Sequence, residues 1–598
     1  MKPIRTLQAM LVGAVALTWG APAARAQGSS CVSSEAEKSM SACTNAGPNV
    51  MNVGQHGKNP HISFKSAPQA VDLKKKDASN KPGGPTEKMA ASQRDVREAT
   101  LKPRVRALLI SEISGLESLY RSTQRNSPDR VQIMRRLAET YVELESASFR
   151  DKTEAEIKKN KTDADKAAKV LDGARKAAIK YYGEIKDQYP SYPKLDEVLY
   201  YLAYEYEQAQ DVQNALKVYH ELIQKAPNSK YIPSAYLAFG ELFFGQGQGD
   251  PSKFELAKQA YSEVIKYPPP DNKMFGYAHY KLAYVFWNQG DLDTNNYAKS
   301  LMHFRKAIEF GTQFSNLPNS AQVATAARKD MVPVYALTGR PEKAFDFFKD
   351  LSGDKPGETA KTVKMMDDLG QNYLDTGHYP EAVALYQDLM KRDHGPKYCK
   401  YHGHISEATL AMKSGAKDKI KDVLDQQLQV YKEYSTSGNS NDDKLACANQ
   451  TAGLLAETAM AWHLEAVGSG GVRGTGDAKT MTLAAYLYKR VVDNFTSEQF
   501  AKFEFPRIVK EDWPTVYKIK YAMADLLYFQ KKWAECGPAF DAVVVENPTG
   551  AEAAEAAFAS VLCYQNIYEE KHKGGAARKG AGMMPGDKTK KDAKKDEA

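Results

Sequence analysis

Apolar residues in the middle of the chain recur every three or four positions, the spacing that puts them on one face of an α-helix. The alternation of apolar and polar residues that is typical of strands is nearly absent there. We expect the first helix of the folded part at 105–119, where the apolar positions are Val105, Leu108, Leu109, Ile113, Leu116 and Leu119. The pattern therefore predicts an all-α fold.

A longer pattern repeats on top of this helical spacing. In the stretch 369–389, a large apolar residue precedes the small Gly370, and Ala382 and Tyr386 follow at fixed distances. The same spacing recurs without gaps in 202–227, 331–356 and 523–548, and with an insertion in 137–190, 239–269 and 282–307. A small residue lets a second helix approach closely, so each copy predicts an antiparallel helix pair that must stack on its neighbours to bury its apolar sides.

Two further features refine these helix pairs. Prolines at 227, 269, 356 and 548 are predicted to end second helices, because proline denies the helix a backbone donor. The insertion at 151–169 is long and highly charged. We expect it to lengthen its pair into two extended helices that project from the body.

This pattern resembles the tetratricopeptide repeat over roughly residues 131–570. The resemblance implies a right-handed superhelical solenoid of antiparallel helix pairs that binds proteins or peptides. The chain departs from the family pattern at His394, which stands where a proline is usual, and at the insertions. It is also loosely similar to exported repeat proteins of bacterial envelopes, such as the Tol-Pal coordinator, outer-membrane assembly proteins and components of the gliding apparatus.

The two ends of the chain differ from its middle. Lys2 and Arg5, an apolar run and small residues around Ala26 predict a signal peptide at 1–26, cleaved after Ala26, and a periplasmic mature protein without a membrane-spanning segment. An uncleaved anchor is disfavoured because the run is shorter than the ~20 residues of a spanning helix. We expect a disordered arm at 27–90, a helical cap at 91–130, the solenoid at 131–570 and a disordered basic tail at 571–598.

The net charge of +8 does not indicate a nucleic-acid partner. The excess of basic residues lies in the signal and in the segment from Lys571 onward, which leaves the folded middle close to neutral. We expect no basic face of the kind that binds nucleic acid.

Six cysteines in an exported chain suggest disulfides. Their positions favour sequential pairs, Cys31 with Cys43, Cys399 with Cys447 and Cys536 with Cys563. Other connectivities and buried free thiols stay open at this point.

One short stretch gathers side chains that bind metals. It holds His394, Cys399, His402 and His404, and a zinc site is conceivable because Cys399 and His402 share a helical face. Ordinary capping and surface histidines explain the same residues, so we expect no metal, no cofactor and no catalytic residue. The glycine-rich stretch at 468–480 lacks the Gly-Lys-Ser/Thr of a phosphate-binding loop and is predicted to join two helices.

The strongest candidate for a binding surface is aromatic. First helices line the inner face of such solenoids, and we expect an aromatic groove for a partner protein or peptide there. Its predicted residues are Tyr200, Tyr204, Phe244, Tyr280, Tyr284, Trp287, Tyr521 and Tyr528.

The function predicted from these features is that of a non-enzymatic periplasmic scaffold that binds proteins of a cell-envelope machine, in outer-membrane assembly, division or gliding motility. A cell-wall polysaccharide-binding protein is the first alternative, since aromatic grooves stack on sugar rings. A metal-dependent enzyme built on His394, Cys399 and His402 is the second.

Overall fold

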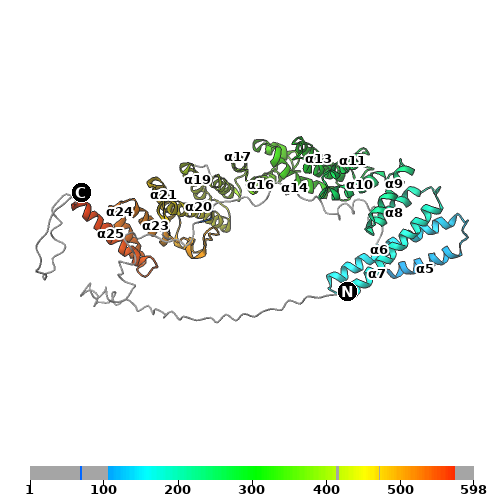
Figure 1. Cartoon of the computed structure of the whole chain (residues 1–598), viewed down its shortest axis with the longest axis horizontal. Coiled ribbons are helices and arrows are strands. Elements are labelled where there is room, and N and C mark those ends of the chain that lie inside the picture. Colours follow the sequence, from blue (N-terminus) through cyan, green and yellow to red (C-terminus); the bar gives the residue numbers. More distant parts are fainter. Residues whose placement is uncertain (1–67, 70–105, 413–415, 470–471, 573–598) are drawn as a thin grey trace, which may run out of the picture. The chain divides into compact units, whose positions relative to one another are not determined.

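The computed structural model describes residues 68–69, 106–412, 416–469 and 472–572 (Figure 1). Its backbone divides into two compact units, Val71–Gly415 and Ala416–Ala598 together with Met1–Ala70. In both units the described residues are mostly helical, as the sequence predicts. The predicted signal peptide and nearly all of the predicted arm and tail lie outside the described residues.

The 71–415 unit is a series of helices joined by short connections. Its elements are α5 (Arg106–Ser122), α6 (Asp129–Ile157), α7 (Lys161–Gln188), α8 (Leu195–Gln208), α9 (Val212–Lys225), α10 (Ile232–Gly247), α11 (Lys253–Val264), α12 (Phe275–Asn288), α13 (Asn295–Gln313), α14 (Ser320–Thr338), η3 (Pro341–Lys343), α15 (Ala344–Lys349), α16 (Ala360–Thr376), α17 (Tyr379–Arg392) and α18 (Tyr398–Ala411).

The 416–598 unit continues the same architecture and adds one short β-hairpin. Its elements are α19 (Lys417–Ser435), α20 (Asn441–Val467), β1 (Gly468–Ser469), β2 (Val472–Arg473), α21 (Ala478–Asn494), α22 (Ser497–Phe500), η4 (Lys510–Asp512), α23 (Val516–Phe529), α24 (Trp533–Glu546) and α25 (Ala553–His572). The helix α25 includes Lys571 and His572, so the helical part extends two residues into the predicted tail.

Within each unit, most helices that follow one another in the sequence pack side by side, which confirms the predicted all-α stack of antiparallel pairs. The predicted role of the small residues is visible at two of the close approaches. A Cβ on Gly370 of α16 would lie 2.6 Å from Cζ of Tyr386 on α17, and a Cβ on Gly240 of α10 would overlap the ring of Tyr261 on α11. Glycine therefore sets the distance between the two helices of these pairs.

Two of the four predicted ends of second helices agree with the structure, whereas α11 ends at Val264 and α15 at Lys349, well before Pro269 and Pro356. α9 ends at Lys225 and α24 ends at Glu546, each two residues before a proline, Pro227 and Pro548. Because the residue before a proline is disfavoured in helical conformation, these prolines limit how far the helices can run.

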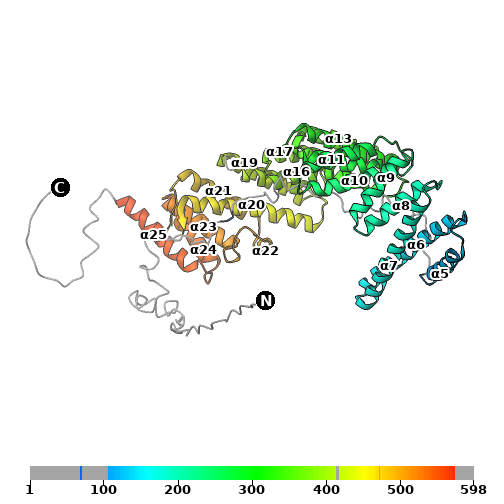
Figure 2. The ribbon, with the colours of Figure 1, turned by 45° about the vertical axis from the view of Figure 1, so that its right-hand side comes forward.

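The charged insertion forms the two extended helices that the sequence predicts, α6 and α7 (Figure 2). The turn between them is closed by Asn160, whose side chain accepts a hydrogen bond from the backbone N–H of Asp163 at 3.2 Å. α5 runs antiparallel along α6, since Arg106 pairs with Asp151 while Tyr141 donates to Glu117. The hairpin thus rests on α5 along part of its length.

The apolar face predicted for the first helix is only partly correct. Leu109 and Ile113 are buried against α6 and α7, but Leu108 and Leu119 are 63% and 50% exposed. The two exposed leucines lie at the margin of the helical face, where α6 no longer covers them.

Candidate functional site

All eight residues predicted to line an aromatic groove are buried, none of them more than 7% exposed. They are Tyr200, Tyr204, Phe244, Tyr280, Tyr284, Trp287, Tyr521 and Tyr528. The prediction that their rings face a partner is therefore wrong. First helices in this chain are packed on several sides by neighbouring helices, so the face away from the repeat signature also lies in the interior.

Two of these tyrosines tie α12 to α14. The hydroxyls of Tyr280 and Tyr284 both donate to Oδ2 of Asp330, the latter at 2.8 Å. Burial is the main cause that raises the pKa of each hydroxyl, and the Asp330 carboxylate raises it further. Both tyrosines therefore remain protonated donors, and their role is to satisfy Asp330 between the helices.

A buried ion pair lies between α10 and α12, and sequence reasoning missed it. Nζ of Lys281 lies 3.4 Å from Oε2 of Glu241 and 3.8 Å from the ring centre of Phe244, while Tyr261 donates to Oε1 of Glu241 at 2.7 Å. Burial lowers the pKa of Lys281, and the neighbouring carboxylate opposes that shift. The sequence feature that could have predicted this ion pair is the single lysine inside the apolar stretch 274–287.

The hypothesis that His394, Cys399 and His402 hold a zinc ion is wrong, because Cys399 is not available as a ligand. Cys399 is disulfide-bonded, so its sulfur is not a thiolate that can hold zinc. The ring of His404 lies against Tyr386 with Nδ1 3.2 Å from Glu407, and the ring of His394 lies against Tyr398. Within the described ranges no three histidine, cysteine, aspartate or glutamate side chains are grouped to hold a metal ion.

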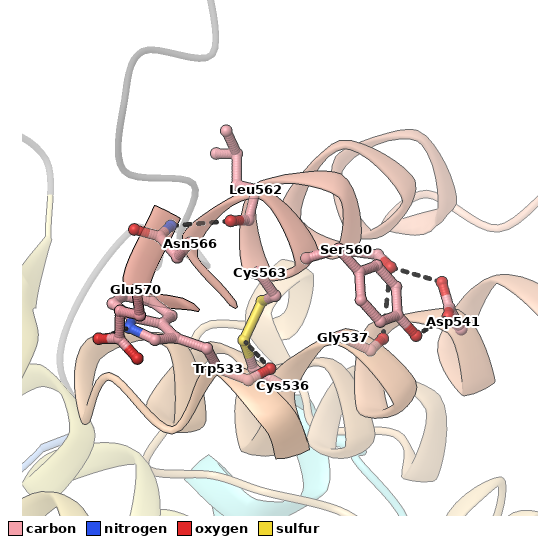
Figure 3. The surroundings of a disulfide bond; sticks show 10 residues. Trp533, Cys536, Gly537, Asp541, Ser560, Leu562, Cys563, Asn566 and Glu570 are labelled. Carbon is pink, nitrogen blue, oxygen red and sulfur yellow. Dashed lines mark hydrogen bonds between the residues drawn. A yellow bond between two sulfur atoms is a disulfide. The ribbon is translucent and has the colours of Figure 1, made fainter. Parts of the chain in front are cut away.

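The predicted bridge between Cys536 and Cys563 is confirmed. It joins α24 to α25, with the two Cα atoms 6.0 Å apart (Figure 3). Next to it the hydroxyls of Ser560 and Tyr564 both donate to the carboxylate of Asp541, the latter at 2.8 Å. Cys399 and Cys447 are each disulfide-bonded too, and their pairing with each other stays a prediction. Cys31 and Cys43 lie outside the described residues.

An open cleft of about 690 Å³ lies in the 71–415 unit, where the α5–α6 and α7–α8 connections meet. The Tyr192 hydroxyl donates to Oε1 of Gln132 at 3.3 Å inside it. Its lining residues are Arg125, Asn126, Ser127, Pro128, Val131, Gln132, Gln188, Tyr189, Tyr192 and Pro193. Amides, two tyrosines and one arginine in an open cleft suit a peptide, which needs backbone hydrogen bonds and an aromatic contact.

A second open cleft, of about 490 Å³, lies in the 416–598 unit. Its floor includes Tyr431, whose ring stacks on Phe495 with centroids 5.0 Å apart and whose hydroxyl accepts from Gln499 at 3.3 Å. Lys444, Lys502 and Asp442 add charge to its lining. Neither cleft was predicted, because helical spacing gives no information about the connections that form them.

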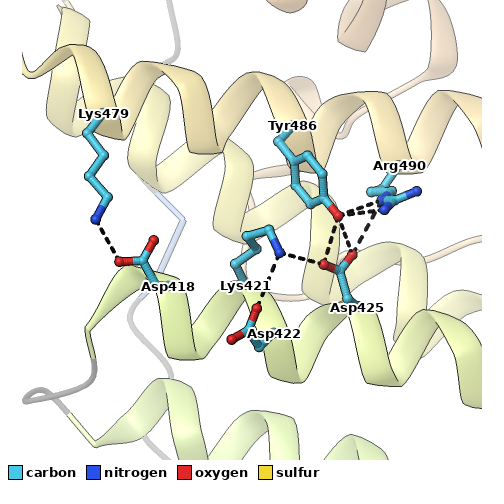
Figure 4. Close-up of polar contacts among 7 residues, drawn as sticks. All are labelled: Asp418, Lys421, Asp422, Asp425, Lys479, Tyr486 and Arg490. Atoms are coloured by element: carbon cyan, nitrogen blue, oxygen red, sulfur yellow. Dashed lines mark hydrogen bonds and ion pairs between the residues drawn. The ribbon is translucent and has the colours of Figure 1, made fainter.

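A polar cluster joins α19 to α21 (Figure 4). Asp425 accepts from Tyr486 at 2.7 Å and from Lys421 at 2.9 Å, and Nε of Arg490 lies 3.3 Å from its other oxygen. Lys479 pairs with Asp418 at 2.6 Å nearby. Since these charges are satisfied by one another, the cluster holds two helices together and is not a strong candidate for ligand binding.

Comparison with known families finds one match within this architecture. Residues 197–229, which include most of α8 and all of α9, match the tetratricopeptide repeat. The chain therefore contains a tetratricopeptide-type helix pair, as the sequence pattern predicts. No curated protein matches the chain.

Two solved structures are similar to the chain at low identity. One is described as the structure of Naa15/Naa10 bound to HypK-THB, with 13% identity over 71% of this chain and 61% of that chain, and a TM-score of 0.20. The other is a circular tandem repeat protein with novel repeat topology, with 12% identity over 78% of this chain and 98% of that chain, and a TM-score of 0.16. The chain thus spans less than two thirds of the first of these.

None of the helices in the described ranges is both long enough and apolar enough to cross a membrane.

Proposed function

We propose that this chain is a non-enzymatic scaffold that holds other proteins of the cell envelope, and that a peptide segment of one partner binds the cleft between the α5–α6 and α7–α8 connections. The observation that supports this proposal is a difference between the side chains inside the helix pairs and those that line the cleft. The aromatic and ionisable groups of the helix pairs contact one another, whereas the cleft offers Tyr189, Tyr192 and side-chain amides at an open surface.

The proposed location rests on two supports. The sequence carries the features of a cleaved signal at 1–26, and disulfides such as Cys536–Cys563 persist in oxidising compartments outside the cytoplasm. N-terminal sequencing of the protein from a periplasmic fraction is expected to begin at Gln27. Recovery of the full chain from the cytoplasm with its cysteines reduced would contradict the proposal.

The partner site can be tested by crosslinking in living cells. A photo-reactive amino acid in place of Asn126, which is exposed in the cleft, is expected to capture one defined protein by mass spectrometry. The matched control places the same group at Lys217, exposed on α9 outside the cleft. Equal adducts from both positions, or none from Asn126, would refute the cleft as the binding site.

The two alternative functions lose the residues on which the sequence based them. Stacking on sugar rings requires exposed aromatic faces, but the eight predicted rings are buried. A metal-assisted reaction through Cys399 requires a thiolate, but this cysteine is disulfide-bonded. The scaffold is the function that the described geometry supports best.

A further inference from the structure

A partly buried arginine of α14 has no carboxylate partner. Nε of Arg328 donates to the backbone carbonyl of Leu351 at 2.6 Å, and Nη2 donates to the hydroxyl of Thr312 at 3.3 Å. Among the described residues no carboxylate oxygen lies within 4 Å of its nitrogens. By contrast, the partly buried Arg135 and Arg175 of the same unit lie 2.9 Å and 2.6 Å from a glutamate oxygen. Burial lowers the pKa of Arg328, so its charge is held in the protein without a counterion.

A lysine of α16 reaches the same turn of the chain. Nζ of Lys361 donates to the backbone carbonyl of Gly353 at 2.9 Å. In the described part of the chain this ammonium group also has no carboxylate oxygen within 4 Å. Arg328 and Lys361 are thus both fastened to carbonyls of the turn 351–353, which follows α15. Two cations held side by side repel each other, and an anion between them would remove that cost.

Gly353 shows how close the two cations come. A Cβ built at this residue would lie 3.3 Å from Nη2 of Arg328 and 3.9 Å from Nζ of Lys361, and these two side chains supply its nearest neighbours outside 352–354. Gly353 is exposed and has a φ of 74°, in the left-handed region that glycine adopts without penalty. The space beside both cations is therefore open to solvent, because residue 353 has no side chain.

The acidic residue of this turn is engaged elsewhere. Oδ1 of Asp354 accepts from the backbone N–H of Lys361 at 2.9 Å, and Oδ2 accepts from the backbone N–H and the hydroxyl of Thr362 at 2.9 Å and 2.8 Å. This carboxylate therefore satisfies the donors of the first turn of α16. Asp350, next to the end of α15, is exposed and lies no closer than 4 Å to the two cationic groups.

We propose that the turn 351–353 binds an oxyanion, a carboxylate or a phosphate group, between the guanidinium of Arg328 and the ammonium of Lys361. A guanidinium presents its N–H donors in a fixed fork that matches two oxygens of one anion, and an ammonium adds a third donor. The hydrogen bonds to Leu351 and Thr312 use Nε and Nη2, which leaves Nη1 available and holds the fork in place. This site lies on α14 and α16, so it is independent of the peptide cleft proposed above.

The strength of binding follows from the openness of the site. Charged contacts that water reaches contribute little each, and salt screens them. We expect dissociation constants of roughly millimolar size for free ions. An oxyanion that belongs to a larger molecule would bind more tightly, because its other contacts add to this one.

Hydrogen exchange of the segment 351–362 in the mature chain tests the proposal with inorganic phosphate, acetate and chloride at equal ionic strength. A ligand present at several times its dissociation constant lowers local opening several-fold, so phosphate is expected to slow exchange relative to chloride. Slowing by acetate as well identifies a carboxylate as ligand, and slowing by phosphate alone identifies a phosphate group. Arg328→Gln should remove the effect, whereas Lys355→Gln, at an exposed lysine of the same connection, should keep it. Equal exchange in the three salts, or an effect that persists in Arg328→Gln, would overturn the proposal.

A carboxylate placed by mutation tests the site without an added ligand. Gly353→Asp and Gly353→Asn have the same shape and are both tolerated at positive φ, but only the aspartate brings a charge next to Arg328 and Lys361. After correction for intrinsic rates, the segment 351–362 is expected to exchange about threefold more slowly in Gly353→Asp than in Gly353→Asn, and salt should shrink the difference. The matched controls are Gly357→Asp and Gly357→Asn, because Gly357 has a φ of 87° and a Cβ there meets nothing within 4 Å. A difference at Gly353 no larger than that at Gly357 would refute the oxyanion site.

Discussion

The Nδ1 atoms of His279 on α12 and His303 on α13 lie 2.9 Å apart in the interior of the 71–415 unit. Only one of two facing nitrogens can carry the proton between them, so one ring donates from its Nδ1–H and the other accepts at its unprotonated Nδ1. Burial lowers the pKa of His279 to about 3, with a further contribution from His303, and it lowers the pKa of His303 to about 4.

Acid is therefore expected to loosen the α12–α13 pair. In the unfolded chain both histidines titrate near their ordinary pKa of about 6.5, which is above the folded values. Their contribution is complete above pH 7 and is lost as the pH falls from about 6.5 toward 4, by about 1.4 kcal/mol per pH unit for each histidine that gains a proton only on unfolding. Hydrogen exchange of α12 and α13 at pH 8, 6 and 5 measures this, and His279→Leu with His303→Leu should flatten the dependence. The same pH dependence in that variant would assign it to other groups.

Gly240 and Gly245 provide a matched test of close helix packing within α10. Alanine at Gly240 would overlap the ring of Tyr261, which is fixed by its bond to Glu241, so Gly240→Ala should cost about 1–3 kcal/mol. A Cβ on Gly245 meets nothing within 4 Å, and Gly245→Ala should stabilise the helix by about 0.5–1 kcal/mol. Thermal unfolding of both variants checks the difference in sign. Equal effects would mean that the repeat does not depend on the small residue.

The buried pair of Lys281 and Glu241 should be far more sensitive than an exposed one. Glu241→Gln leaves the Lys281 charge without its counterion in the interior, where the lysine is 3% exposed, and should cost about 3–5 kcal/mol. The control Glu309→Gln removes an exposed pair with Lys306 and should change the free energy of unfolding by less than about 1 kcal/mol. Urea unfolding of the two variants separates these outcomes, and similar losses would contradict the buried ion pair.

The Cys536–Cys563 disulfide should hold α25 in place. The two cysteines are 27 positions apart, and a closed loop of that length is worth on the order of 3 kcal/mol in the chain-entropy account. Replacing both cysteines with serine should speed hydrogen exchange in α25 while leaving α6 and α7 unchanged. If exchange in α25 stays the same, the bridge adds nothing to the packing of that helix.

The sequence was sufficient for the helix pairs and insufficient for their surfaces. The spacing of Gly370 and Tyr386 predicted the close approach of their two helices, and the charged insertion predicted the long α6–α7 hairpin. Both features depend only on contacts within one helix pair. Tyr280 and Trp287 were assigned to the wrong environment, since their burial depends on α14 and α13, whose positions no local pattern gives. The clefts depend on connections, which have no periodicity to read.

The sulfur–sulfur bond at Cys563 also determines how α25 would respond to mechanical force. Val561 and Tyr564 lie within one turn of it, on the side that faces outward. A force applied to these side chains is transmitted through the backbone of α25 and the disulfide to α24. Separating the packed surfaces of the two helices is therefore not enough to detach α25. A molecule bound at this side of α25 would therefore transmit force to α24 and the helices packed on it, and not to α25 alone.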